Sequence, residues 1–137
     1  EDTFTPEDLN DEQRMVIDMC NEFLSKDVTP HLIELDNKKE GLMQSLLDEA
    51  GKLGLLGAAF PEEYGGSGMD MWSAVVISEE LSKANIGGLA MSLYAHTYLP
   101  LPVINAIGTE EQKQKYLMPA LKGEKIAALG ITEPVSS

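Results

Sequence analysis

Residues 51–69, GKLGLLGAAFPEEYGGSGM, decide the fold because they interrupt a chain whose other segments show helical periodicity. Glycines break the apolar run, and Pro61 favours extended backbone at the residue before it. The glycines near the end of the stretch permit positive φ. The stretch therefore predicts that one helix ends near Gly54 and another begins near Met69, so on this chemistry alone it is a helix–helix connector.

Helical segments are predicted on both sides of this connector. Their apolar residues recur at intervals of three and four, as one face of a helix requires. Side chains that can cap a helix stand before three of the segments, namely Asn10 or Asp11, Asp70 and Thr109. Prolines should kink or split the fourth segment, because each removes a backbone donor. The five predicted helices run from residue 11 to about Pro30, then over 42–53, 70–84, 89–107 and 110–121, with a solvated connection over 34–41.

The last residues of the chain break the helical pattern. Residues 126–131, IAALGI, form a short apolar run followed by Thr-Glu-Pro, which is typical of a buried strand running into a turn. We therefore predict an all-α bundle of about five helices in residues 1–125, followed by the first strand of an incomplete β domain in residues 126–137. Because the chain starts without Met and stops soon after this run, we expect it to be a segment of a longer protein.

Composition excludes several classes of function. Ten basic and 23 acidic residues give a net charge of −13, which would repel a nucleic-acid backbone or an anionic lipid surface. Cys20 is the single cysteine, so no internal disulfide can form, and its apolar helical context favours a core residue in a reducing compartment over a nucleophile. The sequence has no apolar run of the ~18 to 20 residues that a membrane span needs and opens with no apolar leader, so we expect neither a span nor secretion.

No group of residues forms a reaction centre by itself. The sequence has no Ser-His-Asp set, no cluster with metal-ligand spacing and no G-x-G-x-x-G loop after a strand. His96 lies alone in an apolar segment, where a hydrogen-bonded core histidine is more typical than an acid or base. Glu79 and Glu80 are adjacent, so on a helix one is expected at a buried edge and the other in solvent. We therefore assign no catalytic residue and no metal ligand.

Four motifs, taken in order, resemble a known family. They are LGLLGAAFPEEYGGSGMD at 53–70, SEEL at 78–81, GTEEQKQKYLMPALKGE at 108–124 and LGITEP at 129–134. Each motif alone is a weak signal, but their shared order and spacing make chance a poor explanation. Together they resemble the N-terminal part of the acyl-CoA dehydrogenases, from about Leu9 to Pro134.

This resemblance implies a FAD-dependent flavoenzyme with a helical N-terminal domain, a middle β domain and a C-terminal four-helix bundle, assembled as a dimer or tetramer. In this family a glutamate removes the α-proton of an acyl-CoA while a β-hydride passes to flavin N5, and the electrons leave through an electron-transfer flavoprotein. The location would be the bacterial cytoplasm or the mitochondrial matrix. No residue here matches the catalytic glutamate, so we expect the segment alone to be inactive and to hold no stoichiometric flavin.

The resemblance also implies which residues of this chain contact the flavin, the acyl chain and the partner protein. Those matching the strand that contacts the flavin are Leu129, Ile131 and Thr132, although the Thr132 hydroxyl could instead cap its own turn. Those matching the helix that lines the fatty-acyl cavity are Ser92, Ala95, His96, Leu99 and Leu101. Those matching the docking surface for the electron-transfer flavoprotein are Val16, Leu55, Met69 and Ile77, for which an ordinary core role is equally open. Ser137 departs from the family, which has glycine there.

Two other functions stay open at this point. The chain could be a stand-alone helical interaction module, in which residues 126–134 are a tail and the apolar fourth segment packs in a homodimer. It could also belong to an oxygen-using relative of the acyl-CoA oxidase type. The length of the acyl chain is not predicted by the sequence.

Overall fold

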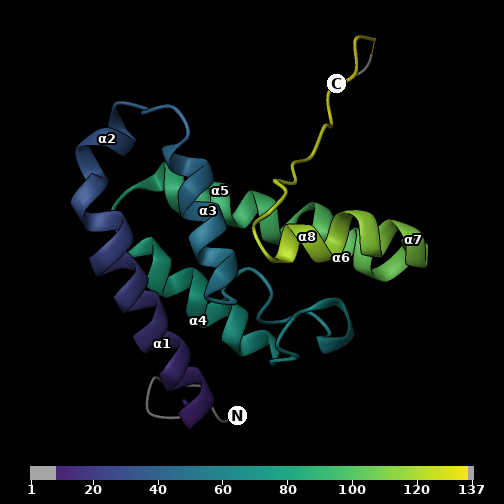
Figure 1. The fold of residues 1–137 in the computed structure, drawn as a ribbon, viewed down its shortest axis with the longest axis horizontal. Helices are drawn as coiled ribbons and strands as arrows, with labels where there is room; N and C mark the ends of the chain where they lie inside the picture. The colour runs from purple at the N-terminus through teal and green to yellow at the C-terminus, as the bar shows by residue number, and fades with distance from the viewer. Residues whose placement is uncertain (1–8, 136–137) are drawn as a thin grey trace.

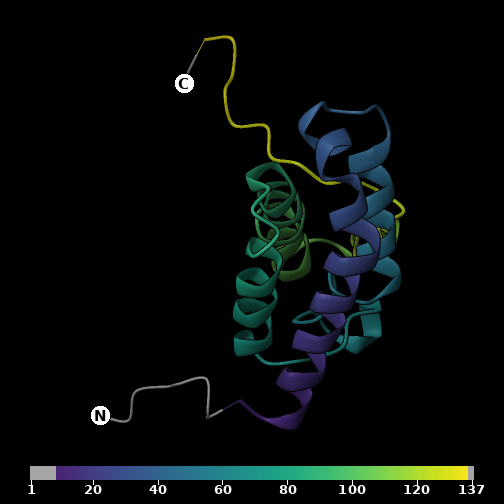
Figure 2. The same ribbon diagram turned by 90° about the vertical axis from the view of Figure 1, so that its left-hand side faces the viewer.

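The computed structural model of the chain describes residues 9–135, and that range is mostly helical, which confirms the predicted bundle of about five helices (Figures 1 and 2). Two π-helical turns, η2 (Leu24–Val28) and η5 (Lys113–Leu117), extend or join α-helices into longer rods. The α-helices are α1 (Asp11–Phe23), α2 (Leu32–Asp36), α3 (Leu42–Lys52), α4 (Met71–Ser82), α5 (Gly87–Tyr98), α6 (Pro100–Ile107), α7 (Glu110–Gln112) and α8 (Met118–Leu121). The 3-10 turns are η3 (Thr29–His31) and η4 (Glu62–Tyr64).

The predicted helix caps are all formed. Asn10 accepts the backbone N–H of Gln13 at 2.8 Å, and the Gln13 side chain accepts the Asn10 N–H in return at 3.0 Å. Asp70 accepts the N–H of Ser73 at 2.9 Å, and Thr109 forms a second capping box with Gln112. These bonds satisfy amide groups that have no partner within their own helix. The caps therefore fix where α1, α4 and α7 begin.

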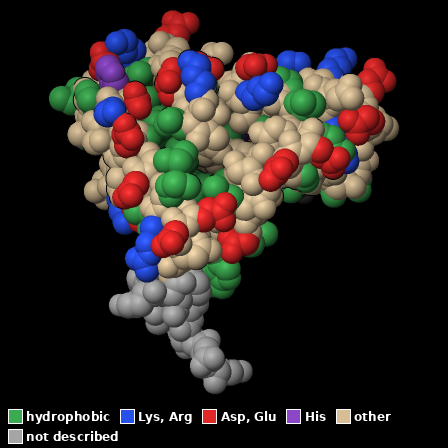
Figure 3. Space-filling view, turned by 60° about the horizontal axis from the view of Figure 1, so that its bottom comes forward, with side chains coloured by type: hydrophobic (Ala, Val, Ile, Leu, Met, Phe, Trp, Pro, Cys, Tyr) green, Lys and Arg blue, Asp and Glu red, His purple; other side chains and the backbone are tan. Residues whose placement is uncertain are grey.

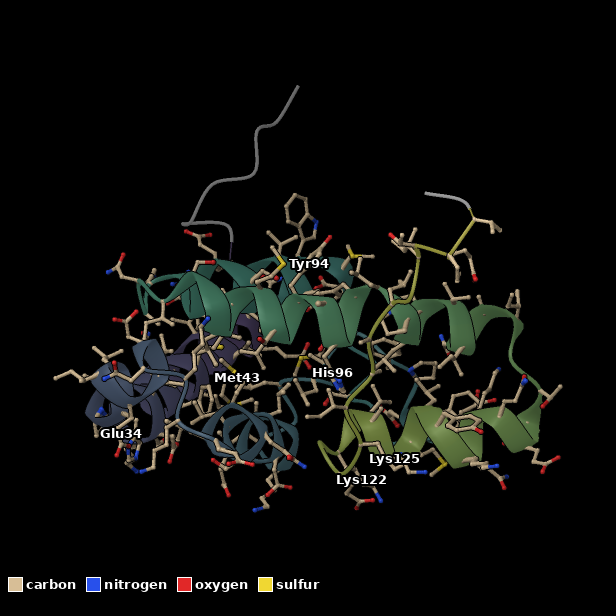
Figure 4. All side chains as sticks on the ribbon, turned by 90° about the horizontal axis from the view of Figure 1, so that it is seen from above. Glu34, Met43, Tyr94, His96, Lys122 and Lys125 are labelled. Carbon is tan, nitrogen blue, oxygen red and sulfur yellow. The ribbon has the colours of Figure 1, made fainter. Side chains whose placement is uncertain are left out.

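The predicted fourth helix is split in two. Helix α5 ends at Tyr98 and α6 begins at Pro100, because the proline ring lacks an N–H and crowds the preceding turn. The two helices still run nearly end to end, and α7, η5 and α8 return antiparallel beneath them (Figure 4). Helix α5 therefore extends from α3 at one part of its length to α8 at another.

The buried residues form two clusters. The larger one, the first core, lies between α1, α3, α4 and the start of α5, where the helices gather on one side of the molecule (Figure 1). The smaller one, the second core, lies between α6, η5 and α8 and consists of Phe60, Leu101, Leu117, Ala120 and Leu121. On the face shown in Figure 3, carboxylates and basic side chains surround a patch of hydrophobic side chains. Helix α5 is thus the element that connects the two cores.

The connector at residues 51–69 is a hydrogen-bonded loop. The Gly57 carbonyl accepts the N–H groups of Phe60 and Ser67, and the Phe60 carbonyl accepts that of Gly68. A Cβ added to Gly66 would lie 2.1 Å from the Phe60 carbonyl oxygen, so no other residue fits there without a shift. The glycines therefore let two backbone segments of the loop lie in direct contact, and the loop places Phe60 in the second core.

The C-terminal residues differ from the predicted strand. Residues 126–132 are extended, but within the described range they pair with no other strand, and only Glu133 forms an isolated bridge. A strand needs a neighbour to receive its backbone hydrogen bonds, and here the extended chain crosses α5 instead (Figure 4). We name residues 125–132 the exit segment. The division at residue 125 into two domains stays a prediction, and Ser136 and Ser137 lie outside the described residues.

Candidate functional site

A cleft of about 570 Å³ opens between α3, α5 and the exit segment. Its lining is mostly apolar, and it includes two exposed lysines from the connection between α2 and α3. Small side chains of α5 and of the exit segment form the opposite wall. The residues that line it are Leu35, Lys38, Lys39, Glu40, Gly41, Met43, Gln44, Leu47, Ser92, Ala95, Ile126, Ala127 and Ala128.

Two of the five predicted wall residues line this cleft. Ser92 and Ala95 are half-buried and three residues apart, so they share one face of α5. Met43 projects toward the same space from α3 (Figure 4). A site with small side chains on one wall and a flexible thioether on the other can accommodate an apolar chain.

The other three predicted wall residues lie elsewhere. Leu101 is fully buried in the second core, and Leu99 is 37% exposed at the junction of α5 and α6. The His96 side chain is buried on the side of α5 that faces α8, whereas Tyr94 lies on the outer side (Figure 4). The α5 helix therefore presents only part of the predicted set to the cleft.

The His96 ring bonds to two backbone groups. Its Nε2 lies 3.0 Å from the Ala120 carbonyl oxygen, and its Nδ1 accepts the N–H of Ala127 at 3.0 Å. Burial lowers the pKa of this imidazole, although the bond to the Ala120 carbonyl opposes the shift. The ring is therefore neutral near pH 7 and has no free nitrogen to act as an acid or base in the cleft.

The predicted flavin-contacting residues stand beyond this bond on the exit segment. Leu129 is 46% exposed and Ile131 is 73% exposed, on extended backbone. Thr132 is also exposed. Alternate apolar side chains and an accessible backbone suit the edge of a flat aromatic ring such as a flavin. Leu129, Ile131 and Thr132 are therefore accessible to a ligand, and their contact with a flavin stays a prediction.

The predicted docking residues lie largely inside the protein. Val16, Leu55 and Ile77 are almost fully buried in the first core, and Met69 packs against that core while staying partly exposed. Leu55 and Ile77 also border a smaller cavity of about 250 Å³ between α4 and α5. Met69 is therefore the most accessible of the four predicted docking residues.

A buried carboxylate lies in the first core, as the sequence predicted for one of the two adjacent glutamates. Glu79 is exposed and Glu80 is 5% exposed, with its Oε1 2.6 Å from the Lys83 ammonium. Its Oε2 has no hydrogen-bond partner among the described residues. Burial and the charge of Glu80 raise the pKa of the Cys20 thiol to about 12, so the thiol stays protonated. Cys20 is therefore a core residue, as predicted.

Sequence reasoning missed the far wall of the cleft. Met43 belongs to the apolar stripe of α3, and nothing in that stripe distinguishes a cleft residue from a core residue. Lys38 lines the cleft with φ of +54°, a conformation that its sequence does not signal. In residues 9–135 no cluster of three metal-ligating side chains occurs. No helix in that range is both long and apolar enough to cross a membrane.

Comparison with known proteins agrees with the sequence motifs. The family model described as "Acyl-CoA dehydrogenase, N-terminal domain" matches residues 10–124. A probable acyl-CoA dehydrogenase of Bacillus subtilis is 44% identical over 134 residues, which cover 97% of this chain and 22% of that protein. A short-chain specific acyl-CoA dehydrogenase of Clostridium acetobutylicum is 45% identical over 126 residues, covering 92% of this chain and 33% of that protein.

Two solved structures extend this similarity to the fold. The acyl-CoA dehydrogenase of Bacillus anthracis, complexed with FAD, superimposes with a TM-score of 0.87 at 44% identity, covering 98% of this chain and 22% of that one. Butyryl-CoA dehydrogenase of Megasphaera elsdenii gives a TM-score of 0.82 at 36% identity, covering 99% and 35%. The chain thus spans between about a fifth and a third of the length of these relatives.

Proposed function

Since the chain belongs to the acyl-CoA dehydrogenase family, as its N-terminal helical domain, we propose that it is part of an enzyme that oxidises an acyl-CoA thioester at the α and β carbons with FAD. The electrons would pass to an electron-transfer flavoprotein, and the whole protein would form a homo-oligomer. Its location would be the cytoplasm of a bacterium or the mitochondrial matrix of a eukaryote. The chain supplies binding walls rather than the catalytic base, because none of its residues matches the family's glutamate.

One observation carries this proposal. The cleft is lined on one side by Ser92 and Ala95, which we predict to contact the acyl chain, and on another by Ile126, Ala127 and Ala128, which lead into the predicted flavin segment. An acyl chain in the cleft would therefore lie next to the chain that holds the cofactor. This proximity is what oxidation of the substrate by the flavin requires.

The exit segment is the proposed flavin contact. Leu129 and Ile131 would pack against the ring edge, and the Thr132 hydroxyl would hydrogen-bond to the ring. When bound, the flavin accepts a hydride from the substrate. The role of the chain is to hold this ring in place and to exclude water from one side of it.

Docking of the electron-transfer flavoprotein is proposed at the surface over the first core. Met69 is partly exposed there and packs against the first core, to which the buried Val16, Leu55 and Ile77 belong. Replacement of Met69 by Glu would place a charge on an apolar contact, so it should slow electron transfer to the flavoprotein. Reduction of the bound FAD by substrate in the absence of the partner should be unchanged.

The decisive test uses the full-length protein that contains this chain. We expect it to purify with FAD, to be reduced by an acyl-CoA without oxygen, and to be reoxidised faster by an electron-transfer flavoprotein than by air. Rapid reoxidation by air would favour an acyl-CoA oxidase. A full-length protein that binds no FAD would overturn the proposal and favour a helical interaction module.

A variant tests the acyl wall. Ala95→Leu would fill part of the cleft, and a misfit of a single methylene in an apolar pocket is enough to lower kcat/KM by about 10- to 200-fold. The loss should be larger for long acyl-CoA substrates than for short ones. Met91→Leu is a matched control, because Met91 is 62% exposed and does not line the cleft. An equal loss for all chain lengths would contradict the assignment of the wall.

A further inference from the structure

His96 joins three separate segments of the fold. It projects from α5, and its two ring nitrogens meet the Ala120 carbonyl at the end of α8 and the Ala127 amide in the exit segment. The side chain is 1% exposed. Figure 4 shows it where α5, α8 and the exit segment converge. A single buried imidazole thus fixes how the extended chain leaves the helical domain.

The two bonds determine the protonation state of the ring. A carbonyl oxygen can only accept, so Nε2 carries the hydrogen, and a backbone amide can only donate, so Nδ1 is a bare acceptor. The ring must therefore be neutral to make both bonds. A second proton on Nδ1 would face the Ala127 N–H and would break the bond to the exit segment.

The bond between His96 and Ala127 lies just before the predicted flavin contacts along the chain. Before it, the Lys125 N–H donates to the Pro119 carbonyl at 3.2 Å, and Ala127 packs against the second core. After it, Leu129 and Ile131 are exposed. Within residues 9–135, the bond to His96 is the last fixed point before the predicted flavin contacts. The direction in which residues 129–132 leave the helical domain depends on it.

We propose that His96 is a positioning residue: its Nδ1 accepts the Ala127 N–H and thereby orients residues 129–132 toward the flavin. This role rests on the proposed function, because it is the flavin that gives the direction of the exit segment its importance. His96 does not touch the substrate in this role. It acts through the backbone of the exit segment.

Two conservative variants separate the two bonds. The Oδ1 atom of Asn stands where Nδ1 stands in His, so His96→Asn keeps an acceptor for the Ala127 amide and loses the donor to Ala120. The Nε2 atom of Gln stands where Nε2 stands in His, so His96→Gln keeps the donor and loses the acceptor. Each variant removes the ring and one hydrogen bond, and Asn also leaves a cavity larger by one methylene, so a purely structural loss would be greater for Asn than for Gln.

The experiment measures FAD affinity and amide hydrogen exchange in the full-length holoenzyme and its apo form. We expect His96→Gln to raise the Kd for FAD about tenfold, the equivalent of one buried hydrogen bond, and to speed exchange at Ala127. We expect His96→Asn to leave both values within about twofold of the wild type. His96→Leu should raise the Kd for FAD and speed exchange as His96→Gln does. Thr97→Val is the control, because it removes a different buried polar group from the same helix.

The results test the role of His96 separately from the proposed FAD-dependent function. If Asn and Gln change the Kd for FAD equally, or if Leu leaves it unchanged, His96 is only a structural residue and the proposal is overturned. If the wild-type protein binds no FAD, the proposed function fails. In that case exchange at Ala127 still decides whether the Nδ1 bond holds the exit segment.

Discussion

The first core and the second core are stabilised in different ways. The first core is large, and its helices pack through many leucines, valines and alanines from α1, α3 and α4. Among the described residues the second core contains five buried hydrophobic side chains, and beside it lie the Thr109 capping box, the bonds of His96 and a close backbone approach at Gly51. Apolar area stabilises the first core broadly. The second core depends on a few specific contacts, and it is the one that carries the exit segment.

The largest expected effect compares one buried side chain in each core. Phe23 is fully buried in the first core, so Phe23→Ala should lower the free energy of unfolding by about 3–5 kcal/mol. Leu117→Ala in the second core should cost about 2–5 kcal/mol. Denaturant unfolding measures both, and hydrogen exchange locates them. We expect Leu117→Ala to leave the amides of α1 protected, and a loss of that protection would show that the two cores unfold together.

The next effect concerns the contact between α3 and the end of α8. A Cβ added to Gly51 would lie 2.3 Å from the backbone carbonyl of Lys122, so Gly51→Ala should cost about 1–3 kcal/mol through overpacking. Gly87→Ala is the control, because no atom lies within 4 Å of its added Cβ. Thermal denaturation of both variants checks the prediction. Equal stability of the two would mean that the contact is easily relaxed.

The capping boxes offer a matched pair of smaller size. Thr109→Ala should destabilise the second core by about 1 kcal/mol, and Asn10→Ala should destabilise the first core by a similar amount. Because the second core is small, we expect the Thr109 variant to open it locally, which hydrogen exchange in residues 110–121 would detect. Thr109→Ser should restore protection. A global loss of protection in the Thr109 variant would contradict the independence of the cores.

The smallest effect is a pH dependence that belongs to the second core. Burial lowers the pKa of His96 below its ordinary value of 6.5, so below that pH the unfolded chain binds more protons than the folded one. The free energy of unfolding should therefore fall as the pH drops below about 6.5, and should level off below the folded-state pKa. His96→Asn should remove this slope. Denaturant midpoints measured across this pH range provide the test, and an unchanged slope in the variant would refute it.

The first core was the easier region to predict from sequence. The spacing of Leu46, Leu47 and Ala50 identified the buried face of α3, and Asn10 and Asp70 identified the starts of α1 and α4. These signals are local, because periodicity and capping depend on residues three or four apart. The same logic located the split at Pro100.

The second core and the exit segment were harder to predict, because their features depend on contacts between residues far apart in the sequence. The π-helical turn η5, which supplies Leu117 to this core, has no signal in the local sequence pattern. The exit segment has the composition of a strand, yet its hydrogen bonds within the described range go to helices. His96 was expected to be either a core histidine or a cavity wall. Its bonds to Ala120 and Ala127 required knowing which segments lie beside α5.

The meeting of Gly51 with Lys122 also bears on the order of folding. The two residues are far apart in the sequence, so their contact closes a long loop and is entropically costly until the intervening helices have formed. Helices α1, α3 and α4 can associate before that closure. We therefore expect α8 and the exit segment to dock last during refolding, so that the part of the chain that leads to the cofactor is also the slowest to acquire its native protection. Pulse-labelled hydrogen exchange would reveal this sequence of events.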